Sequence, residues 1–265
     1  MEKKLKSWQG WLLFGGTMVV VFVLGMIAAS VNERHAEVTS VMNNKKTEIT
    51  GIEARNDKFE SNYPREYQTW EATADTSFKS LYNGNQAVDV LEARPEMVIL
   101  WAGYAFSKDY STPRGHMHAI EDMRNTLRVG APMTENEGPQ PATCWTCKSP
   151  DVPRMMQAMG VDNFYKGKWA SLGKEIMNPI GCADCHEPEN MNLHISRPAL
   201  IEAFQRQGKD ITKATQQEMR SLVCAQCHVE YYFKGDGKYL TFPWDKGSTV
   251  EDMEAVSYTH LTLPT

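Results

Sequence analysis

The chain has 265 residues and a formal net charge of −5 at pH 7. No run of Lys and Arg forms the basic stripe that follows a phosphate backbone, so composition excludes a nucleic-acid-binding role. Seven Trp and ten Tyr exclude a disordered chain, and the length allows one large domain or two small ones.

The N-terminus is expected to be an export signal. Lys3, Lys4 and Lys6 precede an uncharged apolar run over residues 11–29, and about 18 such residues can span a bilayer. The basic flank stays in the cytoplasm, so the residues after position 30 are exported. The "IAAS" ending also suits a signal peptidase. Residues 1–30 are therefore a signal anchor or a cleaved signal peptide, and the length of the run favours the anchor.

Residues 31–62 are polar and are expected to form a membrane-proximal stalk. The stretch "YPREYQTWEAT" predicts a helix that begins at Pro64, a residue favoured in a first turn. The apolar run "MVILWAG" fits either a strand or a helix. "PRGHMHAIEDMRNTLRVGAP" has apolar residues at near-helical spacing and predicts a helix that stops at Gly130 and Pro132.

Three further helices are predicted downstream. "SPDVPRMMQAMG" predicts a helix from Ser149 to Gly160, and "SRPALIEAFQRQG" predicts one with Ser196 as its N-cap. "TQQEMRSLVCAQCH" opens with the capping-box pair Thr215 and Glu218. Because the sequence has no clear alternating strands, we expect a mainly α fold of short helices and irregular loops, with few strands.

All the cysteines fall into three Cys-x-x-Cys pairs. "CADCH" and "CAQCH" end in His186 and His228, and Cys-x-x-Cys-His in an exported chain is the attachment motif of c-type haem. The thiols form thioethers, and the adjacent histidine reaches the iron from the same side. A zinc site is the alternative, but it leaves the third pair and both histidines unexplained. The predicted attachment residues are Cys144, Cys147, Cys182, Cys185, Cys224 and Cys227.

The first motif, "CWTCK", has Lys148 where the other two have histidine. A neutral amine can ligate iron once the metal has displaced its proton, so this haem is expected to have a different task from its neighbours. The alternative is a surface lysine beside a redox Cys-x-x-Cys pair. We also expect Trp145 to pack on the porphyrin.

Over residues 56–255 the sequence resembles the ammonia-forming cytochrome c nitrite reductases, a family of pentahaem enzymes. The combination of Cys-Trp-x-Cys-Lys with "SPDV" is the most specific part of this resemblance. The resemblance implies a multihaem c-type cytochrome fold over residues 63–255, with helices packed around haems. The matching stretches are "WAGYAFSKDYSTPRGH", "RNTLRVGAP", "CWTCKSPDVPR", "GKWA", "GCADCH" and "CHVEYYF…FPWD".

The resemblance implies roles for five residues. Lys148 would ligate the catalytic haem, with Arg128 and Tyr231 beside its substrate. Glu230 and the Tyr231 carbonyl would bind calcium, and His116 would be the distal ligand of the haem held by "CAQCH". From the residues alone, Arg128 also suits a charge at a helix end, Tyr231 an amphipathic aromatic and Glu230 a solvated acid. His116 suits either a surface residue or a ligand.

The implied activity is the six-electron reduction of nitrite to ammonium in the bacterial periplasm. The implied partners are nitrite, a membrane-bound multihaem quinol dehydrogenase as electron donor, the membrane itself, and a second copy in a homodimer. The alternative is a three-haem electron-transfer cytochrome without turnover. Lys148 and Arg128 argue against it, because a carrier needs neither an open iron nor an anion clamp.

The resemblance ends near residue 256. Family members carry two further Cys-x-x-Cys-His motifs beyond this point, and residues 256–265, "VSYTHLTLPT", match nothing in the family. We interpret this tail as a truncation or an out-of-frame end, and we expect the chain to be an inefficient enzyme alone.

Overall fold

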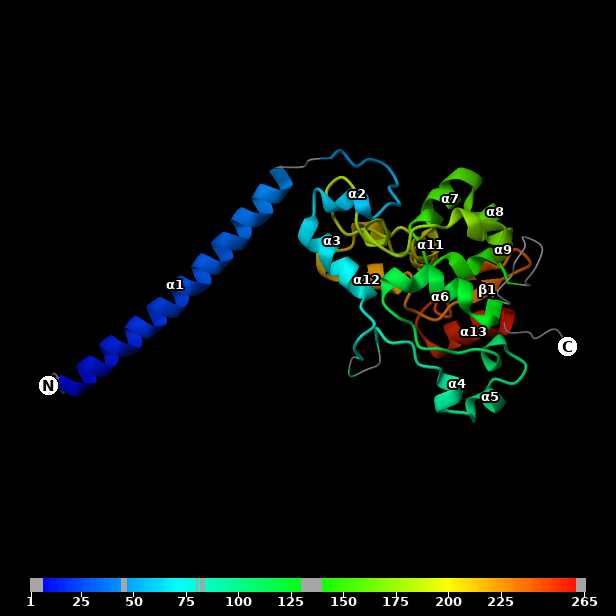
Figure 1. The fold of residues 1–265 in the computed structure, drawn as a ribbon, viewed down its shortest axis with the longest axis horizontal. Coiled ribbons are helices and arrows are strands. Elements are labelled where there is room, and N and C mark those ends of the chain that lie inside the picture. The colour runs from blue at the N-terminus through cyan, green and yellow to red at the C-terminus, as the bar shows by residue number, and fades with distance from the viewer. Residues whose placement is uncertain (1–6, 44–46, 80, 82–83, 130–139, 261–265) are drawn as a thin grey trace. The chain divides into compact units, whose positions relative to one another are not determined.

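The structure is a computed structural model, and it describes residues 7–43, 47–79, 81, 84–129 and 140–260 (Figure 1). The chain divides into two compact units, residues 1–46 and residues 47–265. The first unit is built on one long helix. The second unit contains all three cysteine motifs.

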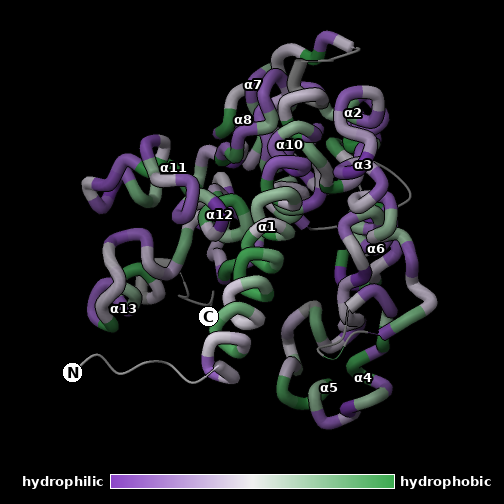
Figure 2. Tube along the Cα trace, turned by 90° about the vertical axis from the view of Figure 1, so that its left-hand side faces the viewer, coloured by the Kyte–Doolittle hydropathy of each residue, from purple (hydrophilic) through white to green (hydrophobic). Residues whose placement is uncertain are grey.

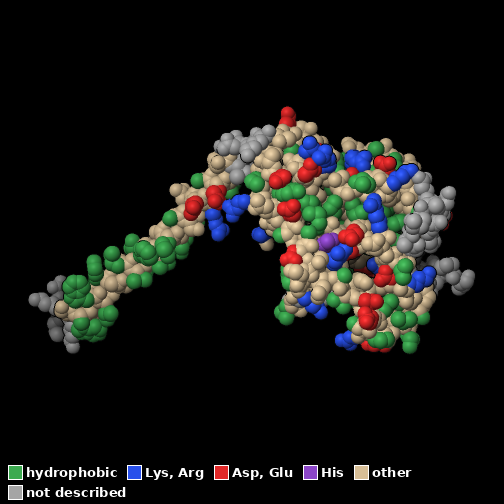
Figure 3. All heavy atoms as spheres, in the orientation of Figure 1, with side chains coloured by type: hydrophobic (Ala, Val, Ile, Leu, Met, Phe, Trp, Pro, Cys, Tyr) green, Lys and Arg blue, Asp and Glu red, His purple; other side chains and the backbone are tan. Residues whose placement is uncertain are grey.

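Helix α1 (Ser7–Asn43) is long and apolar enough over residues 7–40 to cross a membrane, and it is the one such helix among the described residues. Hydrophobic side chains cover most of its length (Figure 3). Glu33, Arg34 and Glu37 follow towards its C-terminal end. The predicted apolar run is therefore helical. The same helix continues into the segment predicted to be a polar stalk.

The second unit is mainly helical, as expected, and its helices are short. Hydrophobic and hydrophilic residues are mixed along this unit (Figure 2). The α-helices are α2 (Asp57–Glu60), α3 (Pro64–Glu71), α4 (Val90–Ala93), α5 (Met97–Leu100), α6 (Ala119–Asn125), α7 (Asp151–Met159), α8 (Val161–Lys166), α9 (Trp169–Leu172), α10 (Cys182–Cys185), α11 (Pro198–Arg206), α12 (Gln216–Ala225) and α13 (Val250–His260). Single 3₁₀ turns cover Ala72–Ala74, Ala105–Ser107, His116–His118, Leu127–Val129, Ala142–Trp145, Gly173–Glu175 and Ile211–Lys213.

Two helix starts were predicted correctly from local chemistry. α3 begins at Pro64, whose missing N–H is harmless in a first turn. α12 begins with the predicted capping box, in which Glu218 accepts from the Thr215 N–H at 2.8 Å and its own N–H donates to the Thr215 hydroxyl at 3.3 Å. α7 ends at Gly160, as predicted, with a φ of 88° that favours glycine. The ambiguous run "MVILWAG" contains helix α5.

Other sequence predictions were wrong because tertiary contacts override local signals. α6 ends at Asn125, where Asp109 accepts bonds from the Thr126 hydroxyl and the Leu127 N–H, each at 2.8 Å. The predicted stop at residues 130 and 132 lies outside the described residues. Ser196 is not the N-cap of α11, because its hydroxyl donates to the Asp184 carbonyl at 2.6 Å.

The core forms around two tryptophans. Trp145 is fully buried and stacks on Trp169, with ring centroids 4.9 Å apart and an angle of 9° between the rings. Its Nε1 donates to the Trp169 carbonyl at 2.9 Å. Because no face of this ring is exposed, the expectation that Trp145 packs on a porphyrin was wrong. Leu200 on α11 and Leu240 on β2 are buried in the same core.

The described strands form one antiparallel hairpin, β1 (Tyr232–Lys234) with β2 (Tyr239–Thr241). Tyr232 pairs with Thr241, and Gly235 turns the chain with a φ of 62°. The hairpin begins just after the third cysteine motif. It therefore fixes the backbone on the C-terminal side of residue 231.

Candidate functional site

The three cysteine motifs lie on short helical turns. The second forms α10 and the third lies at the end of α12. In both, the histidine N–H donates to the carbonyl of the first cysteine, at 2.9 Å for His186 and 2.8 Å for His228. In the first motif, the Lys148 N–H donates instead to the Trp145 carbonyl at 2.9 Å. The lysine motif therefore differs from the histidine motifs in its backbone as well as in its ligand.

All six cysteine thiols are free. Burial raises the pKa of Cys144 and of Cys182 to about 11, and that of Cys185 to about 12. Cys147 behaves differently, because a hydrogen bond from the Cys227 thiol lowers its pKa. The first and third motifs thus meet at their second cysteines.

The rings of His116 and His228 lie close together. Their ring centroids are 6.2 Å apart, with 39° between the ring planes. Two metal–nitrogen bonds of about 2 Å, extended by half the width of each ring, span a gap of this size. Burial lowers the pKa of His116, and His228 lowers it further, so the neutral, ligating form is favoured. The structure therefore brings together the two residues that the resemblance pairs.

His186 is already in the tautomer that a metal ligand needs. Its Nδ1 lies 2.8 Å from the Met191 carbonyl, and a carbonyl can only accept, so this nitrogen carries the proton. That leaves the Nε2 lone pair free, as is usual for metal-bound histidine. The donor atoms in the two histidine motifs, paired thiols with an adjacent imidazole, fit a c-type haem.

Arg128 is held by residues that the sequence analysis did not identify. Its guanidinium carbon lies 5.2 Å from the ring centre of Phe106 and 5.7 Å from that of Tyr110, within the range of cation–π attraction. Its Nε donates to the Thr126 hydroxyl at 3.3 Å, and that hydroxyl donates to Asp109. Phe106, Asp109 and Tyr110 of the stretch "WAGYAFSKDYSTPRGH" therefore support this arginine.

Arg128, Tyr231 and the lysine motif gather in one region of the second unit. The positive charges of Lys148 and Arg128 both act to lower the pKa of Cys144. Burial, followed by the thiols of Cys144 and Cys147, raises the pKa of Tyr231, so this phenol stays protonated. Tyr231 is the residue immediately before β1, whereas Arg128 lies in the separate 3₁₀ turn Leu127–Val129.

Gln140 connects the arginine to the motif through a short chain of contacts. Its Nε2 donates to the Arg128 carbonyl at 3.3 Å, and its Oε1 lies 3.9 Å from the Cys144 sulfur. No sequence signal marked Gln140, since it precedes the motif by four residues and belongs to no recognised pattern. His118, which the sequence left unassigned, has a structural role through contacts with Glu121 and the Ala74 carbonyl.

The predicted calcium site is incomplete in this structure. Glu230 is exposed, and no group of three or more His, Cys, Asp or Glu side chains that could hold a metal ion occurs among the described residues. Calcium needs about six to eight oxygen ligands. Glu230 and the Tyr231 carbonyl would supply only part of such a set, so calcium binding stays a prediction.

The comparisons with known proteins show the family. The family model for cytochrome c552 matches residues 55–261. The chain belongs to the cytochrome c552 family. It is 96% identical over 267 aligned positions to cytochrome c-552 of Parabacteroides distasonis, covering 98% of this chain and 54% of that protein. Cytochrome c-552 of Porphyromonas gingivalis is 72% identical, with 96% and 51% covered.

A solved structure supports the fold of this cytochrome c552 homologue. The catalytic subunit NrfA of cytochrome c nitrite reductase from Desulfovibrio desulfuricans matches with a TM-score of 0.69 and 31% sequence identity, over 81% of this chain and 48% of that one. The mainly α, NrfA-like multihaem cytochrome fold expected from the sequence is confirmed. The chain spans about half the length of the curated relatives it matches.

Proposed function

We propose that this chain reduces nitrite to ammonium at a c-type haem held by Cys144, Cys147 and Lys148. The observation that carries the proposal is the gathering of Arg128 and Tyr231 at the lysine motif. When bound, haem supplies the iron site and the transfer of electrons. The protein supplies the lysine ligand of the iron, the positive charge beside the substrate and the protons.

Arg128 would bind and orient the nitrite anion. Its charge is permanent, and its planar fork of N–H donors matches the two oxygens of nitrite. The rings of Phe106 and Tyr110 hold the guanidinium from the side without consuming those donors. Nitrite would therefore meet a positive charge that is already in position, which is the condition for electrostatic catalysis.

Tyr231 would provide a protonated hydroxyl beside the substrate. Its raised pKa keeps the phenol neutral in the physiological range, so it can donate a hydrogen bond to an oxygen of nitrite. Lys148 would hold the haem of the first motif through its Nζ. The thiols of "CADCH" and "CAQCH", with His186 and His228, would hold the haems that deliver electrons.

The proposed setting follows from the family and from α1. The chain would face the periplasm, with α1 as membrane anchor or signal segment. It would receive electrons from a membrane-bound multihaem quinol dehydrogenase. A homodimer and a calcium ion bound near Glu230 complete the proposal.

Nitrite titration of the haem-loaded chain tests the site directly. We expect nitrite to change the absorption and electron paramagnetic resonance spectra of one haem in three. Lys148→His should alter the spectrum of that same haem before nitrite is added. If nitrite changes no haem spectrum while all three haems are attached, the proposed substrate site is wrong.

One observation favours a second function, that of an electron-transfer cytochrome. His116 and His228 lie close together and would both hold the haem of the third motif, as in a carrier that binds no substrate. A haem-loaded chain that exchanges electrons but neither binds nor reduces nitrite would establish this function instead.

A further inference from the structure

A buried arginine lies where the three cysteine motifs meet. Arg197 has no exposed surface and precedes α11. Its Nε donates to the Thr146 carbonyl at 2.7 Å, within the first motif. Its Nη2 donates to the Ser149 carbonyl at 2.9 Å and to the Asp184 carboxylate at 2.5 Å. One guanidinium therefore binds both the first and the second motif.

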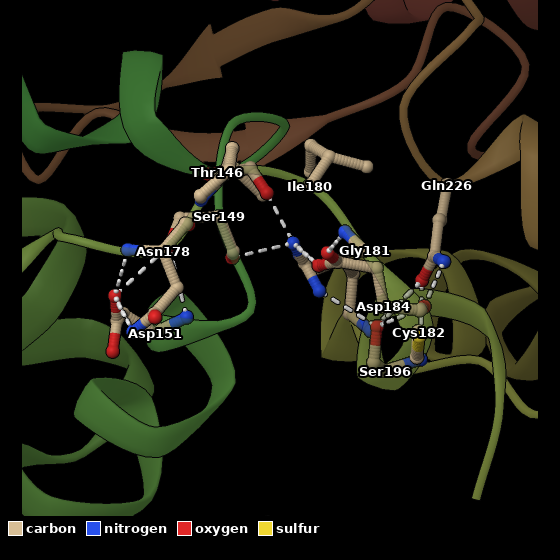
Figure 4. Close-up of polar contacts among 12 residues, drawn as sticks. Thr146, Ser149, Asp151, Asn178, Ile180, Gly181, Cys182, Asp184, Ser196 and Gln226 are labelled. Atoms are coloured by element: carbon tan, nitrogen blue, oxygen red, sulfur yellow. Dashed lines mark hydrogen bonds and ion pairs between the residues drawn. The ribbon is translucent and has the colours of Figure 1, made fainter. Parts of the chain in front are cut away.

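Gln226 adds the third motif to the same network. Its Nε2 donates to the Asp184 carbonyl at 2.7 Å, and its Oε1 accepts from the N–H groups of Ser196 and Arg197, each at 3.1 Å. Ser196 contributes its hydroxyl, which accepts from Arg197 Nη1 at 2.7 Å. Figure 4 shows Thr146, Asp184, Ser196 and Gln226 converging on this centre.

The three motifs reach this network through the same position. Thr146, Asp184 and Gln226 are each the second variable residue of a Cys-x-x-Cys pair. The second cysteine of each pair follows immediately. The network thus lies beside one attachment point of every motif.

The cost of burying this ion pair indicates a role beyond stability. Asp184 is 2% exposed and Arg197 is 0% exposed, and removing two charges from water is unfavourable unless their attraction offsets it. An apolar pair of similar volume would often be as stable. What an apolar pair cannot do is bind two backbone carbonyls, a carboxylate and a hydroxyl in fixed directions, as a planar guanidinium does.

We propose that Arg197 is a positioning residue that fixes the three haem-attachment motifs relative to one another. Asp184 and Gln226 transmit this constraint to the second and third motifs. The spacing of the haems is then set by the polypeptide through one shared centre. The proposal rests on haem attachment at the three motifs and does not depend on nitrite turnover.

Arg197→Lys and Gln226→Met test the constraint in the haem-loaded chain. Lysine keeps the positive charge of Arg197 but lacks the planar set of N–H donors of a guanidinium. The first and second motifs are then no longer held together. We expect altered exciton coupling in the Soret circular dichroism, which reports the mutual geometry of the haems, and a shifted reduction potential. Gln226→Met releases only the third motif, so we expect the potential of a single haem to shift.

Arg206→Lys is the matched control. Arg206 forms a 2.5 Å ion pair with the buried Asp245 at the other end of α11, away from the motifs. This variant should keep the wild-type Soret dichroism and potentials. If Arg197→Lys yields no haem-loaded protein, Gln226→Met decides. Wild-type dichroism and potentials in Gln226→Met, or in a fully loaded Arg197→Lys, would overturn the proposal.

Discussion

Arg128 depends on neighbours that no motif identifies, and this dependence gives a test of its role. Arg128→Met should lower the rate of nitrite reduction by about 10²-fold, the usual loss when a preorganised donor is removed from a charged transition state. Arg128→Lys should recover only part of the rate, because an ammonium lacks the planar fork. The measurement is oxidation of a reduced viologen by nitrite.

Arg94→Met is the control for this prediction. Arg94 is exposed and pairs only loosely with Glu96, at 3.9 Å, so its loss should leave the rate unchanged. Equal rates for wild type and Arg128→Met would show that Arg128 has no role in nitrite reduction.

Asp151 makes stability depend on pH. Its burial opposes ionisation, but hydrogen bonds from the N–H groups of Asn178 and Met177, each at 2.9 Å, outweigh burial and lower its pKa. The pKa of Asp151 in the folded protein lies below the unfolded value of about 3.9. The ionised Asp151 side chain therefore stabilises the fold above that pH. This stabilisation is lost as the pH falls through the folded pKa. Asp151→Asn should therefore cost about 1–3 kcal/mol at pH 7 and much less in strong acid.

Thermal unfolding of the two proteins at several pH values checks this dependence. Asp236→Asn, in the exposed loop between β1 and β2, should show no such difference. A penalty for Asp151→Asn that stays constant into strong acid would contradict the assigned ionisation.

The sequence alone predicts the chemistry of the candidate site but not the residues that support it. Cysteine spacing and Lys148 are local patterns, so they can be read without a structure. Phe106, Asp109 and Gln140 act through contacts made only after folding. Arg197 lies in "SRPAL", where nothing in the local pattern indicates that it will bind residues of three distant motifs.

Among the helices, α12 offers the clearest test because it carries the third motif. Thr215→Ala removes the hydroxyl of the capping box and should cost about 1 kcal/mol. It should also reduce haem attachment at Cys224 and Cys227, measured by mass spectrometry of the peptide. Thr249→Ala is the matched control, since Thr249 forms the same contacts with Asp252 before α13, which bears no motif. Equal loss of haem in both variants would contradict the argument.

Helix prediction succeeded where a few neighbouring residues determine the outcome. Pro64 and the pair Thr215 and Glu218 act within one turn, so the starts of α3 and α12 follow from sequence. Ser196 suited an N-cap equally well, but its hydroxyl binds the Asp184 carbonyl instead. The end of α6 depends on Asp109, which lies in another segment. Local sequence patterns cannot predict hydrogen bonds to residues that are distant in the chain.

We predict that the two units have separate roles: α1 anchors the chain in the membrane, and the second unit carries the haem chemistry. α1 has the length and hydropathy to cross a membrane, so the whole chain should remain in the membrane fraction after alkaline washing. The chain lacking residues 1–30 should be released in soluble form when exported by another signal. Mature protein that is soluble and begins near residue 30 would show instead that the segment is a cleaved signal peptide.

The proposed reaction converts nitrite to ammonium at the haem held by the lysine motif. The most direct measurement is the product formed from ¹⁵N-nitrite by the purified, haem-loaded chain with an excess of reduced viologen. We predict ¹⁵N-ammonium as the product, and a strong loss of it in Lys148→His with all three haems still attached. Full haem loading without any ¹⁵N-ammonium would contradict this claim for the chain and identify it as an electron-transfer cytochrome.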